Sequence, residues 1–376
     1  MHLPTATWGD APWLTPAPLS ASEPPEQRST IIVGAGLTGL SAAYHLARRG
    51  IDVAVLDAET IGSGASGRTG GLALEDTAAG IRTGVGDCLP FLARLVSDAG
   101  IACDLRLQGC RELAHATTPP HDTWAWRDDD SYLVRHGMVP GGTVDPVALL
   151  QGLARAAVAA GATIHEHHAV TAIAPGRPST LGVSGRTLTA EHVVLALNAY
   201  TPTLYESPKA IRAALTFALG TAPLPDAVIA DLGLADGRPF YTADTPYLWG
   251  RTLSDGRLVL GAGLTFDPDN TLRRIAIDKG DAAQALARLE TRVRRFHPRL
   301  ARVEITHRWG GPVAFRTDAE PIVGHHPDTD RMIVTGAYAG HGVALSVRVG
   351  ALVAAAIADG QALPPWGAVA PRPTTT

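Results

Sequence analysis

Three closely spaced glycines and one acidic residue near the N-terminus have the spacing that binding of a dinucleotide requires. Gly34, Gly36 and Gly39 follow the pattern G-x-G-x-x-G. Its glycines allow a tight turn, close approach of the backbone to a pyrophosphate, and close packing of a helix on a strand. Asp57 follows further along, where a carboxylate can accept hydrogen bonds from a ribose 2′-hydroxyl. Because this carboxylate would repel a 2′-phosphate, we expect a cofactor without one.

The elements around these residues occur in the order that a Rossmann-type unit requires. The apolar run at 30–33 predicts a buried strand, and residues 37–49 predict a helix that ends at Gly50. Residues 53–56 predict the second strand. A G-x-G-x-x-G motif alone is weak evidence, but this order favours a nucleotide-binding unit over a chance glycine-rich turn. The free N–H groups at the start of the helix would then bind phosphate.

A second loop of small residues, G-S-G-A-S-G-R-T-G-G, follows at 62–71. Such a loop suits a backbone pressed against an extended ligand, with N–H donors near phosphate or ribityl oxygens. Here the sequence resembles the FAD-dependent amine and amino-acid oxidoreductases of the D-amino-acid oxidase superfamily. The motif G-A-S-G-R-x-G-G is most similar to that of the γ-glutamylputrescine-oxidase-like and glycine-oxidase-like branch. The resemblance covers residues 28–362 and implies FAD as the cofactor.

The resemblance implies an α/β fold with two domains: a Rossmann-type FAD-binding domain that is split in the sequence, and a substrate domain with a mixed or antiparallel sheet. The expected FAD-binding segments are 29–100, 144–205 and 309–362, and the expected substrate-domain segments are 101–143 and 206–308. Residues 1–28 contain Trp8 and Trp13, which favour an arm that lies on the protein. Residues 363–376 are expected to be a C-terminal tail.

Further helices and strands are predicted from capping residues and apolar runs. Asp145 and Pro146 are typical of a helix start, as N-cap and first helical residue. The expected helices are 90–99, 146–159, 281–296 and 343–358, and the expected strands are 105–116, 163–173, 191–197 and 332–335. In the family, the loop at 336–342 lies beside the flavin ring. The N-terminus of the helix after it would stabilise negative charge on reduced flavin.

The resemblance implies oxidation of a C–N bond. A neutral amine or amino acid would lose hydride from its α-carbon to flavin N5, giving an imine that water hydrolyses. Some relatives place a lysine near flavin N5 for the reaction with oxygen, but the similar segment here, 247–263, contains no lysine. The electron acceptor is therefore oxygen or another molecule. A D-amino-acid-type dehydrogenase and a tailoring flavoenzyme of secondary metabolism remain alternatives.

Four residues are candidates for contact with the substrate or the flavin. Arg251 could hold a carboxylate with two hydrogen bonds, or be an ordinary ion-paired arginine. Tyr247 and Arg251 alternate along one predicted strand with Trp249 between them, so all three are expected on one face. Trp309 suits the core better than a ligand wall. His341 lies between two glycines, which favours a position facing the flavin.

The remaining candidates are contacts of FAD. They are Gly34, Ala35, Gly36, Leu37, Thr38, Gly39, Asp57, Ala58, Ser63, Gly64, Ala65, Ser66, Arg68, Thr69, Gly70, Gly71, Leu72, Val170, Asn198, Gly336, Gly340, His341, Gly342 and Val343. Covalent attachment of flavin occurs in parts of this superfamily through Cys or His. Cys88, Cys103 and Cys110 all lie outside the motifs that match, so we expect non-covalent FAD.

Composition excludes several other classes of protein. The 376 residues carry a net charge of −4 without a basic stripe, which argues against nucleic acid as a partner. Three cysteines without C-x-x-C spacing favour a reduced, cytoplasmic protein. No signal peptide is expected, and the apolar run at 351–358 is too short to span a membrane. His165, His167 and His168 fall on one predicted strand, and no third metal ligand on the face shared by the first two is evident, so no metal is expected.

Overall fold

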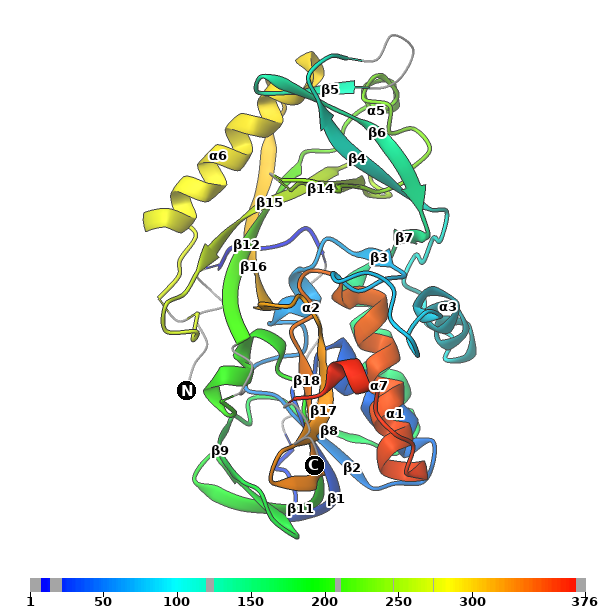
Figure 1. The fold of residues 1–376 in the computed structure, drawn as a ribbon, viewed down its shortest axis with the longest axis vertical. Helices are drawn as coiled ribbons and strands as arrows, with labels where there is room; N and C mark the ends of the chain where they lie inside the picture. The colour runs from blue at the N-terminus through cyan, green and yellow to red at the C-terminus, as the bar shows by residue number, and fades with distance from the viewer. Residues whose placement is uncertain are drawn as a thin grey trace, which may run out of the picture.

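The computed structural model describes residues 8–13, 22–119, 125–206, 211–245, 247–272 and 274–369. Figure 1 shows two lobes, one above the other, each built on its own large sheet with helices against it. Strands and helices contribute to both lobes, so the α/β class expected from the sequence is confirmed.

The lower sheet has the arrangement of a nucleotide-binding unit. Its strands are β1 (Gln27–Val33), β2 (Val53–Leu56), β8 (Thr163–His165), β9 (Val170–Ala174), β10 (Ser179–Val183), β11 (Arg186–Leu195), β17 (Ile322–His326) and β18 (Thr329–Gly336). The order is β17-β18-β11-β1-β2-β8, with β9 and β10 beside β11. The last five strands of this order pair in parallel. Their carboxyl ends therefore meet at one edge, where Rossmann-type sheets bind ligands.

The described residues form five helices in this lobe. They are α1 (Leu37–Ala47), α2 (Ala65–Arg68), α3 (Cys88–Asp98), α4 (Pro146–Ala159) and α7 (Gly342–Asp359). Of these, α1, α4 and α7 pack on the sheet, α3 packs on α7, and α2 lies between α4 and the upper strand β16 (Ile305–Arg316). At the crossing of α1 and α7, the hydroxyl of Ser41 donates to the carbonyl of Val347 at 2.6 Å. A Cβ at Gly350 would lie only 2.6 Å from that of Ser41, so glycine is needed for this close approach. The contact joins the first and last helices that flank the sheet.

The helix α7 is longer than the apolar run at 351–358 suggests. Its 18 residues have a mean hydropathy of 1.7, which is enough by length and composition to cross a membrane. However, 61% of the helix is buried in the protein, where it packs on α1 and α3. This is the position of a core helix.

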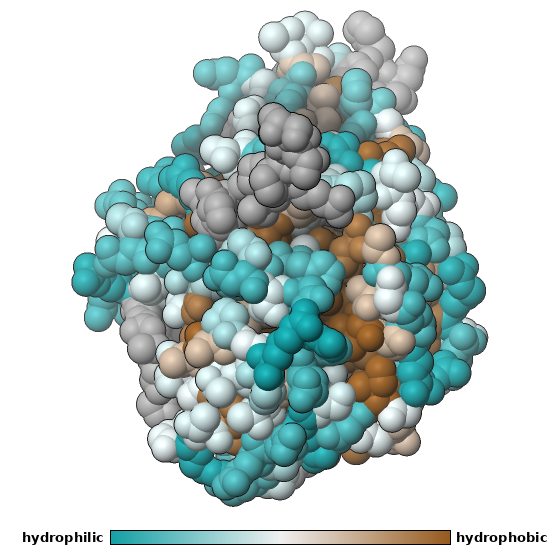
Figure 2. Space-filling view, turned by 60° about the horizontal axis from the view of Figure 1, so that its bottom comes forward, coloured by the Kyte–Doolittle hydropathy of each residue, from teal (hydrophilic) through white to brown (hydrophobic). Residues whose placement is uncertain are grey.

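Figure 2 shows a face of the molecule that is largely hydrophilic, with a narrow strip of exposed hydrophobic residues.

The upper sheet is mixed, as expected for the substrate domain. Its strands are β4 (Cys110–Ala116), β5 (Ala125–Asp128), β6 (Ser131–Val139), β12 (Ile211–Thr221), β13 (Phe240–Thr242), β14 (Trp249–Thr252), β15 (Leu258–Phe266) and β16 (Ile305–Arg316). The order is β16-β12-β15-β14-β13-β4-β6-β5, in which β13 and β4 are parallel. The amphipathic helix α6 (Gly280–Phe296) packs its apolar side on β12 and β15 and lies along the outside of this lobe in Figure 1.

Smaller elements complete the chain. They are β3 (Leu72–Leu74), which pairs with β7 (Gly141–Thr143), the helix α5 (Asp226–Asp231), and the 3-10 helices Asn198–Thr203, Pro298–Leu300 and Pro365–Gly367. The last of these is in the predicted tail, whose residues 370–376 lie outside the described residues. The predicted strand at 105–116 is shorter than expected, since β4 begins at Cys110.

One expected domain boundary is wrong. We expected residue 309 to begin the last FAD-binding segment, with Trp309-Gly310-Gly311-Pro312 leading the chain back to that domain. Instead these residues lie inside β16, where Trp309 pairs with Ala218 of β12. A Cβ at Gly310 would lie 2.6 Å from Leu215, so this glycine permits close packing within the sheet. The chain returns to the lower sheet only after Arg316.

The capping signal at Asp145 is confirmed, whereas the long strand at 163–173 is not. The Asp145 carboxylate accepts hydrogen bonds from the N–H groups of Val147 and Ala148 at 3.0 and 2.9 Å. The expected strand breaks after His165, because His167 has a positive φ of 61°. The rings that approach each other are therefore those of His165 and His168, 6.1 Å apart. Among the described residues, no group of three His, Cys, Asp or Glu side chains could hold a metal ion.

Candidate active site

Two connected cavities run along the edge where the parallel strands end. The larger has a volume of about 410 Å³ and lies between the two lobes, and the smaller has about 140 Å³ and lies over the carboxyl ends of β1 and β2. They share six lining residues, Gly36, Ala65, Ser66, Ala196, Asn198 and Pro312. Together they form an elongated channel, the shape that an extended dinucleotide requires.

The glycines of the first motif permit close backbone contacts near the point where the two cavities meet. Gly34 has a φ of +107°, and a Cβ there would lie 2.6 Å from the carbonyl oxygen of Ala196. A Cβ at Gly39 would lie 2.0 Å from the carbonyl oxygen of Gly34, so α1 could not pack as closely on β1. Gly36 precedes α1 and has no side-chain cap. The N-terminus of α1 faces the channel, as phosphate binding requires, and the N–H of Leu37 in its first turn donates to the hydroxyl of Ser66 at 3.1 Å.

Asp57 lies at the end of β2 and lines the smaller cavity. Its carboxylate accepts hydrogen bonds from the N–H groups of Ala35 at 2.7 Å and Glu59 at 3.0 Å. Burial raises the pKa of Asp57 to about 6, and the nearby carboxylates of Glu166 and Glu59 add to this shift. A ribose hydroxyl that donates to this carboxylate would favour its charged form. The position and chemistry of Asp57 thus fit the ribose end of a dinucleotide.

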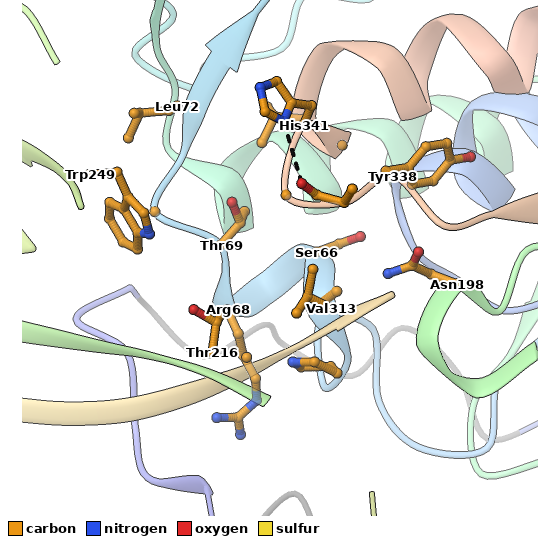
Figure 3. Close-up of a pocket in the computed structure, with 18 of the residues that line it drawn as sticks. Ser66, Arg68, Thr69, Leu72, Asn198, Thr216, Trp249, Val313, Tyr338 and His341 are labelled. Atoms are coloured by element: carbon orange, nitrogen blue, oxygen red, sulfur yellow. Dashed lines mark hydrogen bonds between the residues drawn. The ribbon is translucent and has the colours of Figure 1, made fainter. Parts of the chain in front are cut away.

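The second small-residue loop forms one wall of the larger cavity. Arg68 points its guanidinium away from His341 and Tyr338, as Figure 3 shows, and donates to the carbonyl oxygens of Ser63 and Gly310 at 3.1 and 3.2 Å. At Gly70, a Cβ would lie 2.2 Å from the ring of Trp249, which explains the need for glycine. The cavity side of this loop is therefore mostly backbone and small side chains.

The loop before α7 forms the opposite wall. Asn198 accepts a hydrogen bond from the N–H of Ala337 at 3.0 Å and so holds this loop against β11. His341 lies at the N-terminus of α7, with its Nδ1 3.4 Å from the carbonyl oxygen of Ala339. Burial lowers the pKa of His341, so its imidazole is neutral at neutral pH. This wall presents an uncharged ring and the positive end of a long helix.

The upper sheet supplies the third wall, which is aromatic. Tyr247 donates its hydroxyl proton to the carbonyl oxygen of Gly263 at 2.8 Å, and its oxygen lies 2.7 Å from the hydroxyl of Thr216. Burial raises the pKa of Tyr247 to about 12. Trp309 donates its Nε1–H to the carbonyl oxygen of Arg68 at 2.9 Å and is 1% exposed. Trp309 thus belongs to the core and to the cavity wall at once.

Arg251 does not occupy the position that a carboxylate clamp requires. Its guanidinium is buried and donates to the carbonyl oxygens of Gly71 and Val144 at 3.1 and 2.9 Å. It lines neither cavity, whereas Tyr247 and Trp249 line the larger one. Tyr247 precedes β14, which begins at Trp249, so only Trp249 and Arg251 alternate within this strand. Trp249 lies against Gly70 and Arg251 against Gly71. Arg251 is a structural residue behind the wall.

The structure brings most of the predicted residues together around the channel. Those that line one or both cavities are Gly34, Ala35, Gly36, Leu37, Thr38, Asp57, Ala58, Ser63, Gly64, Ala65, Ser66, Arg68, Thr69, Gly70, Leu72, Val170, Asn198, Gly340, His341, Gly342, Val343, Tyr247 and Trp309. Gly39, Gly71, Gly336 and Arg251 line neither cavity. Gly336 instead allows β18 to approach Asn198, because a Cβ there would lie 2.9 Å from the Cα of Asn198.

Several lining residues are absent from the sequence-based set. Thr216, Val313 and Phe315 come from β12 and β16, and Tyr241 comes from β13. Their positions depend on strand pairing between distant parts of the chain, for which the sequence holds no local signal. Tyr338 could have been found, because it lies inside the glycine-rich loop at 336–342.

The split parallel sheet, the glycine-lined channel and the acidic residue at the end of β2 define a dinucleotide-binding enzyme. The sequence model of the family described as "FAD dependent oxidoreductase" (DAO) matches residues 29–356. The chain belongs to this family and is an FAD-dependent oxidoreductase. The resemblance and the cofactor predicted from the sequence are thereby confirmed.

Individual relatives are more distant. Gamma-glutamylputrescine oxidoreductase of Escherichia coli (strain K12) is 28% identical over 373 residues, covering 86% of this chain and 82% of the relative. Glycine oxidase of Bacillus licheniformis is 25% identical over 356 residues, with coverage of 86% and 91%. The crystal structure of glycine oxidase from Geobacillus kaustophilus has a TM-score of 0.71 at 22% identity, covering 90% of this chain and 96% of that one. This structural likeness shows a shared fold.

Proposed function

We propose that this enzyme oxidises a C–N bond in a small amine or amino acid. Bound FAD would supply the hydride acceptor at N5, and the oxidised substrate would leave as an imine that water hydrolyses. The observation that carries the proposal is the larger cavity. It joins the cofactor loops to an aromatic wall formed by Tyr247, Trp249 and Trp309. The names of relatives that act on amines and amino acids support the same reaction class.

The cavity favours the neutral form of an amine. Hydride can leave the α-carbon readily only when the nitrogen lone pair is free, so the ammonium form must lose a proton. Burial disfavours a charged ammonium and lowers its pKa. Negative charge in the lining would counteract this effect by stabilising the ammonium form. None of the described residues that line the cavity is Asp or Glu. Desolvation between these walls would therefore prepare the substrate without a dedicated base.

The two arginines nearest the cavity favour an amine over an amino acid. A buried carboxylate needs a cation and hydrogen-bond donors. The guanidinium of Arg251 is directed to the carbonyl oxygens of Gly71 and Val144, and that of Arg68 to those of Ser63 and Gly310. Arg251 lines neither cavity, and Arg68 directs its guanidinium to backbone carbonyls. An amine without an α-carboxylate is thus the substrate that this cavity accommodates best.

A dehydrogenase that uses an acceptor other than oxygen is the second candidate. The segment 247–263, in which relatives place a lysine, contributes Tyr247, Leu248 and Trp249 to the cavity. No lysine is among the described residues that line it. This leaves the oxygen reaction without the cation that assists it in some relatives. A D-amino-acid-type dehydrogenase and a tailoring flavoenzyme are further outcomes that the test below would separate.

The decisive experiment is the visible spectrum of the purified protein, recorded without oxygen before and after adding matched pairs of compounds. Each pair is an amine and the amino acid that carries the same side chain plus an α-carboxylate, for example benzylamine and phenylglycine. We expect the amine to bleach the flavin faster. Faster bleaching by the amino acid would contradict the preference for amines. No bleaching by either class would contradict C–N oxidation.

Readmission of oxygen then separates the two kinds of electron acceptor. Rapid recovery of the oxidised spectrum indicates an oxidase, and slow recovery that an artificial acceptor accelerates indicates a dehydrogenase. We further propose that FAD is held without a covalent bond, since Cys88, Cys103 and Cys110 line neither cavity. Flavin that remains in the pellet after denaturation would contradict this. All three cysteines are buried free thiols, which supports a cytoplasmic location.

A further inference from the structure

Residues 8–13, here called the N-terminal strap, follow a fixed path across the upper lobe. Trp8 is fully buried and donates its Nε1–H to the carbonyl oxygen of Ile275 at 2.8 Å. Gly9 has a φ of +67°, and a Cβ there would lie 2.2 Å from the carbonyl oxygen of Arg308. Figure 1 shows this blue segment running between the upper sheet and α2. The strap is therefore packed into the protein beside the cofactor loop.

The first contact of the strap with the cofactor loop is through Arg68. The Nη1 of Arg68 donates to the carbonyl oxygen of Gly9 at 2.8 Å. The guanidinium carbon lies 5.7 Å from the centre of the Trp8 ring. Arg68 ends α2 and lines the larger cavity. The strap thus holds the side chain of Arg68, which is the first of the residues 68–70 that line the larger cavity.

The second contact passes through Arg251. The ring of Trp13 covers the Arg251 guanidinium, with 5.1 Å between the guanidinium carbon and the ring centre. Arg251 is only 5% exposed, and its Nη1 bonds to the carbonyl oxygen of Gly71. A guanidinium over an aromatic face is attracted more strongly when both are shielded from water. Trp13 therefore holds the Arg251 guanidinium in the position from which it bonds to Gly71, at the other end of the segment 68–71.

Between these contacts, two tryptophans of the upper sheet support the loop. Trp309 donates to the carbonyl oxygen of Arg68 at 2.9 Å, and Trp249 packs on Gly70. Ala11 and Trp13 of the strap pack against the same hydrophobic cluster that contains Trp309. The two ends of the segment 68–71 are thus fixed by the strap, Arg68 directly and Gly71 through Arg251. Gly70 packs on Trp249, which adjoins the same hydrophobic cluster as the strap.

We propose that the N-terminal strap is a positioning element for FAD: through Arg68 and Arg251 it holds residues 68–71 in the conformation that contacts the cofactor. Trp8, Gly9 and Trp13 are positioning residues, since they reach the channel only through other side chains. The proposal rests on the FAD site of the family and is independent of the substrate.

The test compares two substitutions of Trp13 in the full-length protein. W13A removes the ring above Arg251, whereas W13F keeps an aromatic ring there. The indole Nε1 of Trp13 has no hydrogen-bond partner among the described residues, so phenylalanine loses no such bond. Apoprotein is titrated with FAD while flavin fluorescence and the visible absorption band are recorded. We expect W13A to raise the dissociation constant of FAD about tenfold and W13F to leave it within about twofold.

The same titration separates positioning from simple stability. We expect the visible band of FAD bound to W13A, measured at saturation, to be shifted or to lose its fine structure, because the loop at 68–71 has relaxed. W366A is the control, since Trp366 bonds to the carbonyl oxygen of Thr83, away from the strap. It should bind FAD like the unsubstituted protein. A W13A protein that melts at a lower temperature but binds FAD with unchanged affinity and spectrum would overturn the proposal.

A third substitution covers the case in which W13A does not fold. W13L keeps an apolar side chain in the cluster but has no aromatic face for Arg251. It should weaken FAD binding in the same direction as W13A and lose less thermal stability. Unchanged FAD affinity and spectrum in W13L would also overturn the proposal.

Discussion

The hydroxyl groups of Thr38 and Tyr338 lie 2.8 Å apart, although 300 positions separate them in the chain. Thr38 is in the first turn of α1, and Tyr338 is in the loop that precedes α7. Both residues line the larger cavity and both are buried. This bond therefore ties the N-terminal end of α1 to the loop that precedes α7, and it joins the two ends of the split sheet.

Removal of this bond should destabilise the protein and show coupling between the two residues. T38V and Y338F each remove this bond between buried hydroxyls, although Tyr338 keeps a side-chain hydrogen bond with Thr335. Each variant should therefore lower the free energy of unfolding by about 1 kcal/mol. The double variant should lose less than the sum, with a coupling energy of about 1 kcal/mol. Urea unfolding of the four proteins measures this cycle. Strictly additive losses would show that the two hydroxyls do not interact.

Substitution of Gly34 should remove the cofactor. The side chain in G34A would meet the carbonyl oxygen of Ala196, and alanine is strained at a φ of +107°. We expect the dissociation constant of FAD to rise on the order of a hundredfold. The flavin-to-protein ratio after purification reports this directly. G86A is the matched control, because a Cβ at Gly86 meets nothing within 4 Å, and a similar loss of flavin there would refute the steric explanation.

The raised pKa of Asp57 predicts a pH dependence of FAD binding. In the free protein this carboxyl has a pKa of about 6, above its ordinary value of 3.8. Because the pKa of Asp57 is higher in the folded protein than in the unfolded chain, the protonated carboxyl stabilises the FAD-free protein. This stabilisation is fully present below about pH 4 and is lost as the pH rises through 6. Ribose hydroxyls donate more strongly to the charged form than to the neutral one. FAD affinity should therefore weaken as the pH falls below 6.

Asp57→Asn provides the control for this pH dependence. The amide keeps a hydrogen-bond acceptor but cannot titrate, so its FAD affinity should be lower at pH 7 and flat between pH 5 and 7. Titration of the apoprotein with FAD at several pH values gives both curves. A D57N protein whose FAD affinity still falls with decreasing pH would assign the effect to another group, such as Glu59 or Glu166, whose carboxylates interact with Asp57.

Arg251 should matter for stability and not for recognition of a carboxylate. R251M removes the hydrogen bonds of Arg251 to the carbonyl oxygens of Gly71 and Val144, of which that of Gly71 still accepts from the N–H of Val144. We expect a loss of about 2–3 kcal/mol in the free energy of unfolding. R274M is the control, because Arg274 is an exposed arginine on the same lobe, and it should cost less than about 0.5 kcal/mol. If R251M selectively weakened the binding of amino acids relative to amines, the alternative in which Arg251 holds the carboxylate of the substrate would be supported.

The cofactor half of the site could be predicted from the sequence because its signals are local. The turn at Gly34, the helix after it and Asp57 lie within one short segment, and backbone requirements alone fix their identities. The cap at Asp145 is equally local. Those features have the same positions in the structure as in the sequence-based expectation.

The substrate half could not be predicted in the same way. The wall residue Thr216 meets Tyr247 only because β12 and β15 pair with a register shift between Thr216 and Phe217. Arg251 was attractive as a clamp because its type suits carboxylates, but the sequence could not show that two backbone carbonyls already surround it. Trp309-Gly310-Gly311-Pro312 was placed at the start of an FAD-binding segment, since the sequence could not show that these residues pair with β12.

The split domain also sets when the cofactor can bind during synthesis. The cavity that begins at Gly34 is closed by Tyr338 and the N-terminus of α7, and β18 is inserted beside β11. A chain still emerging from the ribosome therefore has its phosphate loop long before it has a complete site. Any product that terminates before α7 would carry the whole glycine motif and yet be unable to retain flavin.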